Sequence, residues 1–123
     1  MDFQPTRTLS SVEENHFAVT DGTIHYSISG KGKQDIIWVH GLPLDGSSWY
    51  AQKLYFDEKY RNICIDLRGY GQSSRLPQPI ANVTDLYVAD LLALCKHLSL
   101  SKPIIVGFAS GGHGTLRFAA QNP

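Results

Sequence analysis

The sequence predicts an α/β fold: a mostly parallel sheet that begins with an antiparallel hairpin. Near the start of the chain, two β-rich segments are joined by an Asp-Gly pair, a strong hairpin signal. Short apolar segments then alternate with longer segments of helical periodicity. This alternation is typical of parallel strands joined by right-handed helical crossovers.

Each expected strand is a short apolar or β-branched segment bounded by turn residues. The first two strands meet through Asp21-Gly22, and the third ends at His40-Gly41. In chain order, the expected strands are 16–20, 23–29, 35–39, 62–66 and 103–108.

Three helices are expected among these strands. Ser47 or Ser48 is a suitable N-cap for the first helix, and Thr84 for the second. The second helix also carries an apolar series at helical spacing. The expected helices are 47–58, 84–99 and 112–121, and the glycine- and proline-containing segment 67–82 is expected to be a loop.

The composition is that of an ordinary soluble globular protein. Of the 123 residues, 42% are hydrophobic, and 11 basic residues balance 11 acidic ones to a formal net charge of zero. This balance favours neither nucleic acid nor an anionic membrane as a partner. No apolar run approaches the ~18 residues of a membrane helix, so we expect a cytoplasmic protein.

The two cysteines do not indicate a metal site. Cys64 is expected on a strand and Cys95 on a helix, without the spacing of metal ligands. We therefore expect free buried thiols, and we expect neither a metal nor a cofactor.

The segment Gly107-Phe108-Ala109-Ser110-Gly111-Gly112 carries the chemistry of the chain. Its glycine frame matches the G-x-S-x-G nucleophile elbow, which connects a strand to a helix. Gly107 and Gly111 flank Ala109 two positions away on either side, where only small side chains fit. In the alternative register, with Ser110 as the nucleophile, the Phe108 ring would occupy such a position. The frame therefore assigns the nucleophile position to Ala109.

Glycine-rich loops follow three of the expected strands, after Val39, Asp66 and Phe108. The carboxyl ends of parallel strands lie at one edge of a sheet, where ligands bind in open α/β folds. We therefore expect the three loops to form a single site.

Four features in this order resemble the α/β-hydrolase superfamily along nearly the entire chain. They are the opening hairpin, His40-Gly41-Leu42-Pro43 with Trp49 downstream, Asp66-Leu67-Arg68-Gly69-Tyr70-Gly71-Gln72-Ser73, and the elbow frame. The loop from His40 to Gly46 is further similar to that of cofactor-free haloperoxidases, enol-lactonases and related small esterases.

The resemblance implies roles for the matched positions. The backbone N–H groups of Leu42 and Ser110 would form the oxyanion hole, which stabilises charge developing on an attacked carbonyl. His40 and Gly41 would organise the first loop, and His40 is not expected to be the general base. Asp66 and Arg68 would organise the second loop, with Asp66 as the catalytic acid only as a remote alternative. Trp49 would either line the pocket or pack the first helix.

The chain departs from the family pattern in two ways. Ala109 has no atom that can attack, so covalent catalysis is expected to be absent. The family's acid and histidine follow the elbow, and residues 1–123 are expected to be the N-terminal part of one domain. The strand Ile104-Ile105-Val106 would then lie at an exposed apolar edge that needs a complementary chain or fragment.

Two functional hypotheses from different classes follow. The first is a serine-type hydrolase of carboxylic esters or lactones that is inactive because alanine replaces serine at position 109. The alternative is a natural non-catalytic ligand-binding or interaction protein on the same scaffold. Perhydrolase or haloperoxidase-like chemistry would use the same residues with another acyl acceptor.

Overall fold

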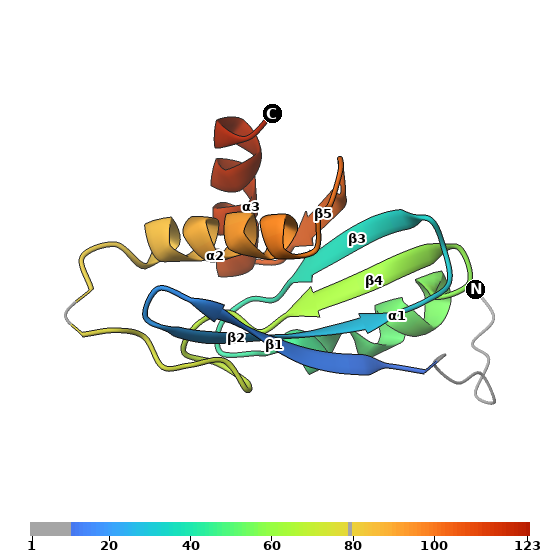
Figure 1. Cartoon of the computed structure of the whole chain (residues 1–123), viewed down its shortest axis with the longest axis horizontal. Coiled ribbons are helices and arrows are strands. Elements are labelled where there is room, and N and C mark those ends of the chain that lie inside the picture. The colour runs from blue at the N-terminus through green and yellow to red at the C-terminus, as the bar shows by residue number, and fades with distance from the viewer. Residues whose placement is uncertain (1–10, 79) are drawn as a thin grey trace.

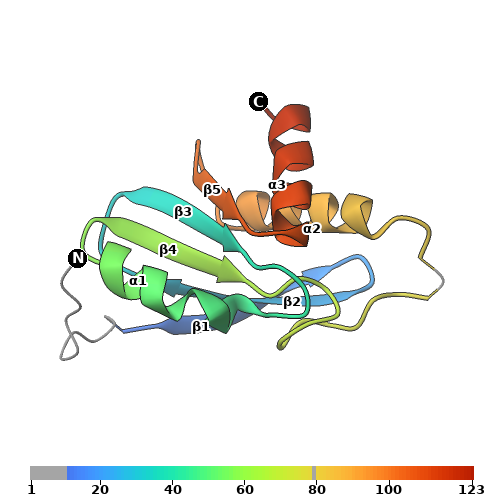
Figure 2. The same ribbon diagram turned by 180° about the vertical axis from the view of Figure 1, so that it is seen from behind.

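The computed structural model describes residues 11–78 and 80–123. These residues form an open five-stranded sheet with helices on both faces (Figures 1 and 2). The strands are β1 (Glu13–Val19), β2 (Gly22–Ser29), β3 (Gln34–Val39), β4 (Tyr60–Ile65) and β5 (Ile104–Gly107). The helices are α1 (Tyr50–Phe56), α2 (Val83–His97) and α3 (Ser110–Gln121), and a 3-10 turn, η1 (Gly46–Trp49), precedes α1.

The sheet topology confirms the expected fold class. The strand order is β1-β2-β4-β3-β5, so β3 lies between β4 and β5 although it precedes both in the chain. Strand β2 pairs antiparallel with β1 and β4, whereas β3 pairs parallel with β4 and β5. Figure 2 shows α1 over the face of β3 and β4 opposite to the face that α2 and α3 cover.

The hairpin turns one residue earlier than the Asp-Gly signal indicates. Gly22 pairs with Val19 inside the ladder, which leaves Thr20 and Asp21 as the turn. A Cβ atom on Gly22 would lie 2.6 Å from the Ser74 hydroxyl oxygen. The glycine therefore permits close approach of the loop that follows β4, rather than supplying the turn conformation.

The helix starts also differ from the expected ones. Asp45, rather than Ser47 or Ser48, caps η1, since its carboxylate accepts the Ser47 N–H at 2.9 Å. Asn82, rather than Thr84, caps α2 by accepting the Asp85 N–H at 3.2 Å. In both cases the cap is the residue whose side-chain oxygen accepts a backbone N–H two or three residues later in the chain. This is the usual N-cap geometry.

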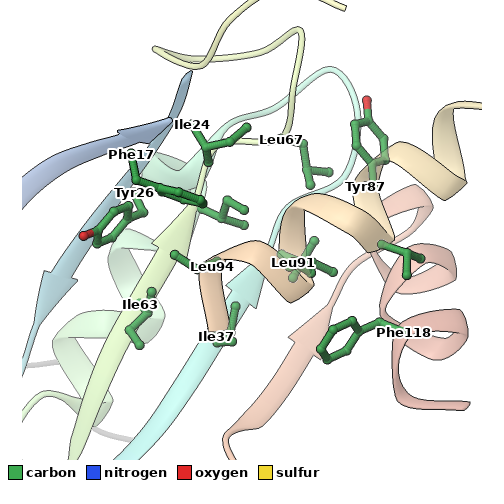
Figure 3. Close-up of a cluster of buried hydrophobic side chains, with 13 residues drawn as sticks. Phe17, Ile24, Tyr26, Ile37, Ile63, Leu67, Tyr87, Leu91, Leu94 and Phe118 are labelled. Atoms are coloured by element: carbon green, nitrogen blue, oxygen red, sulfur yellow. The ribbon is translucent and has the colours of Figure 1, made fainter. Parts of the chain in front are cut away.

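The larger hydrophobic core lies between the sheet and helices α2 and α3 (Figure 3). Leu91 and Leu94 of α2 point from the helix toward Ile37 and Ile63 of the central strands, and all four are fully buried. Phe118 closes the cluster from α3. Complete burial of each such side chain contributes about 1.5–3 kcal/mol, so this cluster fixes α2 and α3 on the sheet.

A smaller apolar cluster lies under α1 on the opposite face. Ile36, Trp38 and Cys64 are buried there, and Phe56 of α1 packs against them. Burial raises the pKa of the Cys64 thiol to about 12, so this sulfur stays protonated and unreactive at neutral pH.

Helix α2 also carries one charged side chain on its buried face. Asp90 receives hydrogen bonds from Arg68 Nε at 3.2 Å and Nη2 at 2.8 Å. The Arg68 and Asp90 side chains are only 2% and 4% exposed. Burial raises the pKa of Asp90, and the hydrogen bonds and charge of Arg68 offset this effect only in part. The pair ties the loop after β4 to α2.

Replacing Asp90 with alanine is expected to lower the free energy of unfolding by about 3–5 kcal/mol, because a buried Arg68 would keep its charge without a partner. Asp85→Ala on the same helix is the matched control. Asp85 pairs with Arg117, but these side chains are 64% and 34% exposed, so its loss is expected to cost less than about 1 kcal/mol. Urea unfolding measures the free energy of unfolding of both variants. An equal decrease in the two variants would contradict the conclusion that the buried Arg68–Asp90 pair stabilises the fold.

Candidate active site

Three loops meet at the carboxyl edge of the parallel strands. They follow β3, β4 and β5, and hydrogen bonds join them to one another. The Leu67 N–H of the second loop donates to His40 Nε2 of the first at 2.9 Å. The Gly46 N–H of the first loop donates to Asp66 Oδ1 of the second at 2.7 Å. The Leu42 N–H of the first loop donates to the Ser110 hydroxyl oxygen of the third at 3.1 Å, so the three loops form one connected unit.

The third loop is a sharp turn between β5 and α3, centred on Ala109. Ala109 has φ 53° and ψ −121°, a backbone conformation that side-chain-bearing residues rarely adopt. Such strained residues cost about 1–3 kcal/mol and occur chiefly at functional sites. Ala109 itself is exposed, so the turn presents position 109 outward at the rim.

Glycines on either side of Ala109 allow this turn to be tight. A Cβ atom on Gly107 would lie 2.6 Å from the Thr115 hydroxyl oxygen and 2.7 Å from the Gly112 Cα. A Cβ atom on Gly111 would overlap the His40 carbonyl oxygen and lie 2.7 Å from that of Val39. The first turn of α3 thus packs directly on the end of β3.

His40 holds the first loop through both ring nitrogens. Nε2 accepts the Leu67 N–H, so the ring proton resides on Nδ1, which lies 2.9 Å from the Gly41 carbonyl oxygen and donates to it. The side chain is completely buried. A neutral imidazole with both nitrogens engaged by backbone is a structural element, and neither nitrogen is free to accept a substrate proton.

Asp66 holds the second loop in a similar way. Its carboxylate accepts the Gly46 N–H, the Gln72 N–H at 2.9 Å and the His25 Nδ1 proton at 2.8 Å. The residue is 4% exposed. All these partners are internal, and the side chain lies at the junction of β2 and the first two loops.

Trp49 ends η1 and occupies the N-cap position of α1, and its side chain packs against the small apolar cluster. Its ring centroid is 5.0 Å from that of Trp38, at an interplanar angle of 43°. Of the two alternatives for this residue, the geometry matches packing of the first helix.

Leu42 and Ser110, the two expected amide donors, lie at the rim beside Ala109. Ser110 is the first residue of α3, so its N–H is one of those that a helix leaves without an internal carbonyl partner. The Leu42 N–H has a partner, because it donates to the Ser110 hydroxyl oxygen at 3.1 Å. The arrangement can orient an oxygen-bearing ligand, but it offers no side-chain nucleophile at position 109.

Comparison with known proteins identifies the fold family. Residues 36–123 match the family model described as the alpha/beta hydrolase fold. The chain belongs to this α/β-hydrolase family. The matched range includes all three loops at the rim.

Curated relatives in the family carry different activity names. A non-heme chloroperoxidase of Burkholderia pyrrocinia is 37% identical over 93 residues, which are 75% of this chain and 33% of the relative. Epoxide hydrolase 4 of Mus musculus is 34% identical over 89 residues, or 72% of this chain and 25% of the relative. The chain thus spans about a third or less of the length of these relatives.

A solved structure supports the fold independently. The structure of a putative epoxide hydrolase from Pseudomonas aeruginosa superimposes with a TM-score of 0.81 at 22% identity, covering 91% of this chain and 38% of that protein. At this identity, the likeness concerns the fold of the α/β-hydrolase and not its substrate.

Two features are absent from the part of the chain that the structure describes. Within residues 11–78 and 80–123, no cluster of histidine, cysteine, aspartate or glutamate side chains is suited to a metal ion. In the same ranges, no helix is long and apolar enough to cross a membrane.

Sequence reasoning missed two residues that support the site, His25 and Asp90. His25 of β2 is buried between Asp66, at 2.8 Å, and the more distant Glu14, at 3.8 Å, and nothing near it in the sequence indicates either partner. Asp90 has a clearer signal, because it is charged and yet lies on the same helix face as Tyr87 and Leu94. A charged residue inside an apolar stripe indicates a buried partner.

Gly111→Ala is expected to lower the free energy of unfolding by about 1–3 kcal/mol, because the added methyl group would force the start of α3 away from β3. Gly112→Ala is the control. A Cβ atom there would lie 3.3 Å from the Gly107 carbonyl oxygen, and alanine gains up to about 1 kcal/mol of helix propensity. Thermal unfolding of both variants measures the difference in stability. A Gly111→Ala protein as stable as the Gly112→Ala protein would contradict the close contact of Gly111 with the carbonyl groups at the end of β3.

Proposed function

We propose that this chain contributes the nucleophile elbow of a serine-type α/β-hydrolase for carboxylic esters or lactones, and that Ala109 leaves it able to bind but not to cleave. The observation that carries the proposal is the strained conformation of Ala109 inside an otherwise complete elbow. A turn of this kind serves to present one side chain to a ligand. Here the presented side chain is a methyl group.

The proposed reaction of the serine form begins with attack by the residue-109 hydroxyl on the acyl carbon. The Leu42 and Ser110 amides would stabilise the negative charge on the carbonyl oxygen, and a histidine outside these residues would accept the hydroxyl proton. That histidine would give the proton to the leaving alcohol as the bond between the acyl carbon and the alcohol oxygen breaks, which leaves an ester on residue 109. Water would then hydrolyse this ester, releasing the acid and regenerating the residue-109 hydroxyl. Without the nucleophile, the amides and binding alone leave a residual acceleration of about 10³–10⁴ over water.

The alternative function is a natural non-catalytic binding protein on the same scaffold. The glycine frame retained around Ala109 is compatible with this alternative as well as with the first proposal, since a binding protein would need the same turn but no nucleophile. The relatives of this chain carry two different activity names, chloroperoxidase and epoxide hydrolase. The ester or lactone assignment rests on the paired amide donors.

We further propose that residues 1–123 form the N-terminal part of one α/β-hydrolase domain. Strand β5 lies at the edge of the sheet, with Ile104 44% exposed, and Leu116 of α3 is 74% exposed. An apolar sheet edge with unpaired backbone groups favours the addition of another strand. Further strands, with the acid and the histidine, would be supplied by a complementary C-terminal part.

Restoring serine tests the proposed activity. In the protein together with its complementary part, Ala109→Ser is expected to raise hydrolysis of p-nitrophenyl acetate by about 10³-fold or more. Ala109→Gly serves as the control and is expected to stay at the starting rate. An Ala109→Ser protein with unchanged circular dichroism and no hydrolysis would contradict the hydrolase and favour the binding protein.

The exposed edge of β5 gives a separate prediction. The 123-residue chain alone is expected to self-associate in sedimentation velocity, and Ile104→Lys is expected to weaken the association by placing a charge at the edge. Tyr50→Lys is the matched control, since Tyr50 is 54% exposed on α1 and lies away from β5. A folded monomer of the unaltered chain would rule out the incomplete sheet.

A further inference from the structure

The amide of Leu42 is held in a fixed direction by its neighbours. The Gly41 carbonyl accepts both the His40 Nδ1 proton and the Leu44 N–H, each at 2.9 Å. These two bonds fix the peptide unit before Leu42. The Leu42 N–H therefore points at the elbow as a consequence of the loop, whatever lies in front of it.

What lies in front of it is the side chain of Ser110. Its hydroxyl oxygen accepts the Leu42 N–H at 3.1 Å. The loop and the elbow are in close contact here, because a Cβ atom on Gly41 would lie 3.2 Å from that of Ala109. An oxygen of the protein thus occupies the place beside residue 109 where an oxygen of a ligand would accept the same N–H.

We propose that the Ser110 hydroxyl is an internal competitor for the oxyanion site, which a carboxylate or ester oxygen must displace before it binds. This inference rests on the proposed function for the identity of the ligand. Displacement is possible because Ser110 is exposed and Leu42 is 37% exposed. Rotation of the serine side chain about χ1 removes its oxygen without any movement of backbone.

The competition lowers the affinity for every ligand oxygen by the same factor, the fraction of molecules in which the amide is free. A typical internal hydrogen bond of this kind leaves the amide free in about a tenth to a third of molecules. Only strong acceptors then bind measurably. A carboxylate forms a charge-assisted bond with an N–H and is a stronger acceptor than a hydroxyl, so we expect an acid to bind more readily than a neutral ester.

Two substitutions of the same residue separate this role from general packing. Ser110→Ala removes the competing oxygen and keeps the Cβ atom, whereas Ser110→Thr keeps a hydroxyl. The protein is labelled with ¹⁵N at its leucine amides, and butyrate is titrated while the Leu42 resonance is followed. Before butyrate is added, the resonance of the Leu42 amide proton is expected to lie upfield in Ser110→Ala, because the hydrogen bond to the hydroxyl oxygen is lost. In Ser110→Thr, this resonance is expected to stay near its position in the unaltered protein.

Butyrate is then expected to bind Ser110→Ala about three- to tenfold more tightly than the unaltered protein, with Ser110→Thr close to the unaltered value. An unchanged Leu42 resonance in Ser110→Ala would overturn the hydrogen bond itself. Equal or weaker butyrate affinity in Ser110→Ala would overturn the competition. A shifted Leu42 resonance with no butyrate binding to any of the proteins would leave the hydrogen bond standing and would contradict the proposed oxyanion site, and with it the proposed function.

Discussion

The contact between the start of α3 and the end of β3 is the constraint on which the rest of the rim depends. Gly111 lies against the carbonyl groups of Val39 and His40. The elbow therefore packs directly against the start of the first loop. His40 then links that loop to the second through Leu67. If α3 began even slightly farther from β3, Leu42 would lose contact with the elbow and Ala109 would have no partner loop.

The order of strands and helices could be predicted from the sequence, because apolar periodicity reports which faces are buried. The single rim could be predicted too, since parallel strands place their following loops together. Helix starts were less predictable: Asp45 and Asn82 displaced the expected serine and threonine caps because side-chain reach decides between neighbouring polar residues. The partners of Asp66 and Arg68 were invisible to local patterns, since His25 and Asp90 lie far from them in the chain.

Two polar side chains of the rim, His40 and Asp66, form internal hydrogen bonds that hold the loops in place. His40 and Asp66 use their ring nitrogens and carboxylate oxygens on internal donors and acceptors. The two small residues at the elbow, Ala109 and Ser110, are exposed at the rim, and on the proposed function the groups that face a ligand are these residues and the backbone amides. This division explains why a site can look chemically rich in sequence and yet contain few side chains that are free to react.

The strained turn at Ala109 has an evolutionary consequence. The close packing around it is permitted by the missing side chains of Gly107 and Gly111, and the side chain at position 109 is itself exposed, so the fold can accept either a methyl group or a hydroxymethyl group there. Alanine and serine codons are interchangeable by a single base change. On the proposed function, a lineage could therefore exchange a catalyst for a binding protein, or the reverse, without losing the folded state.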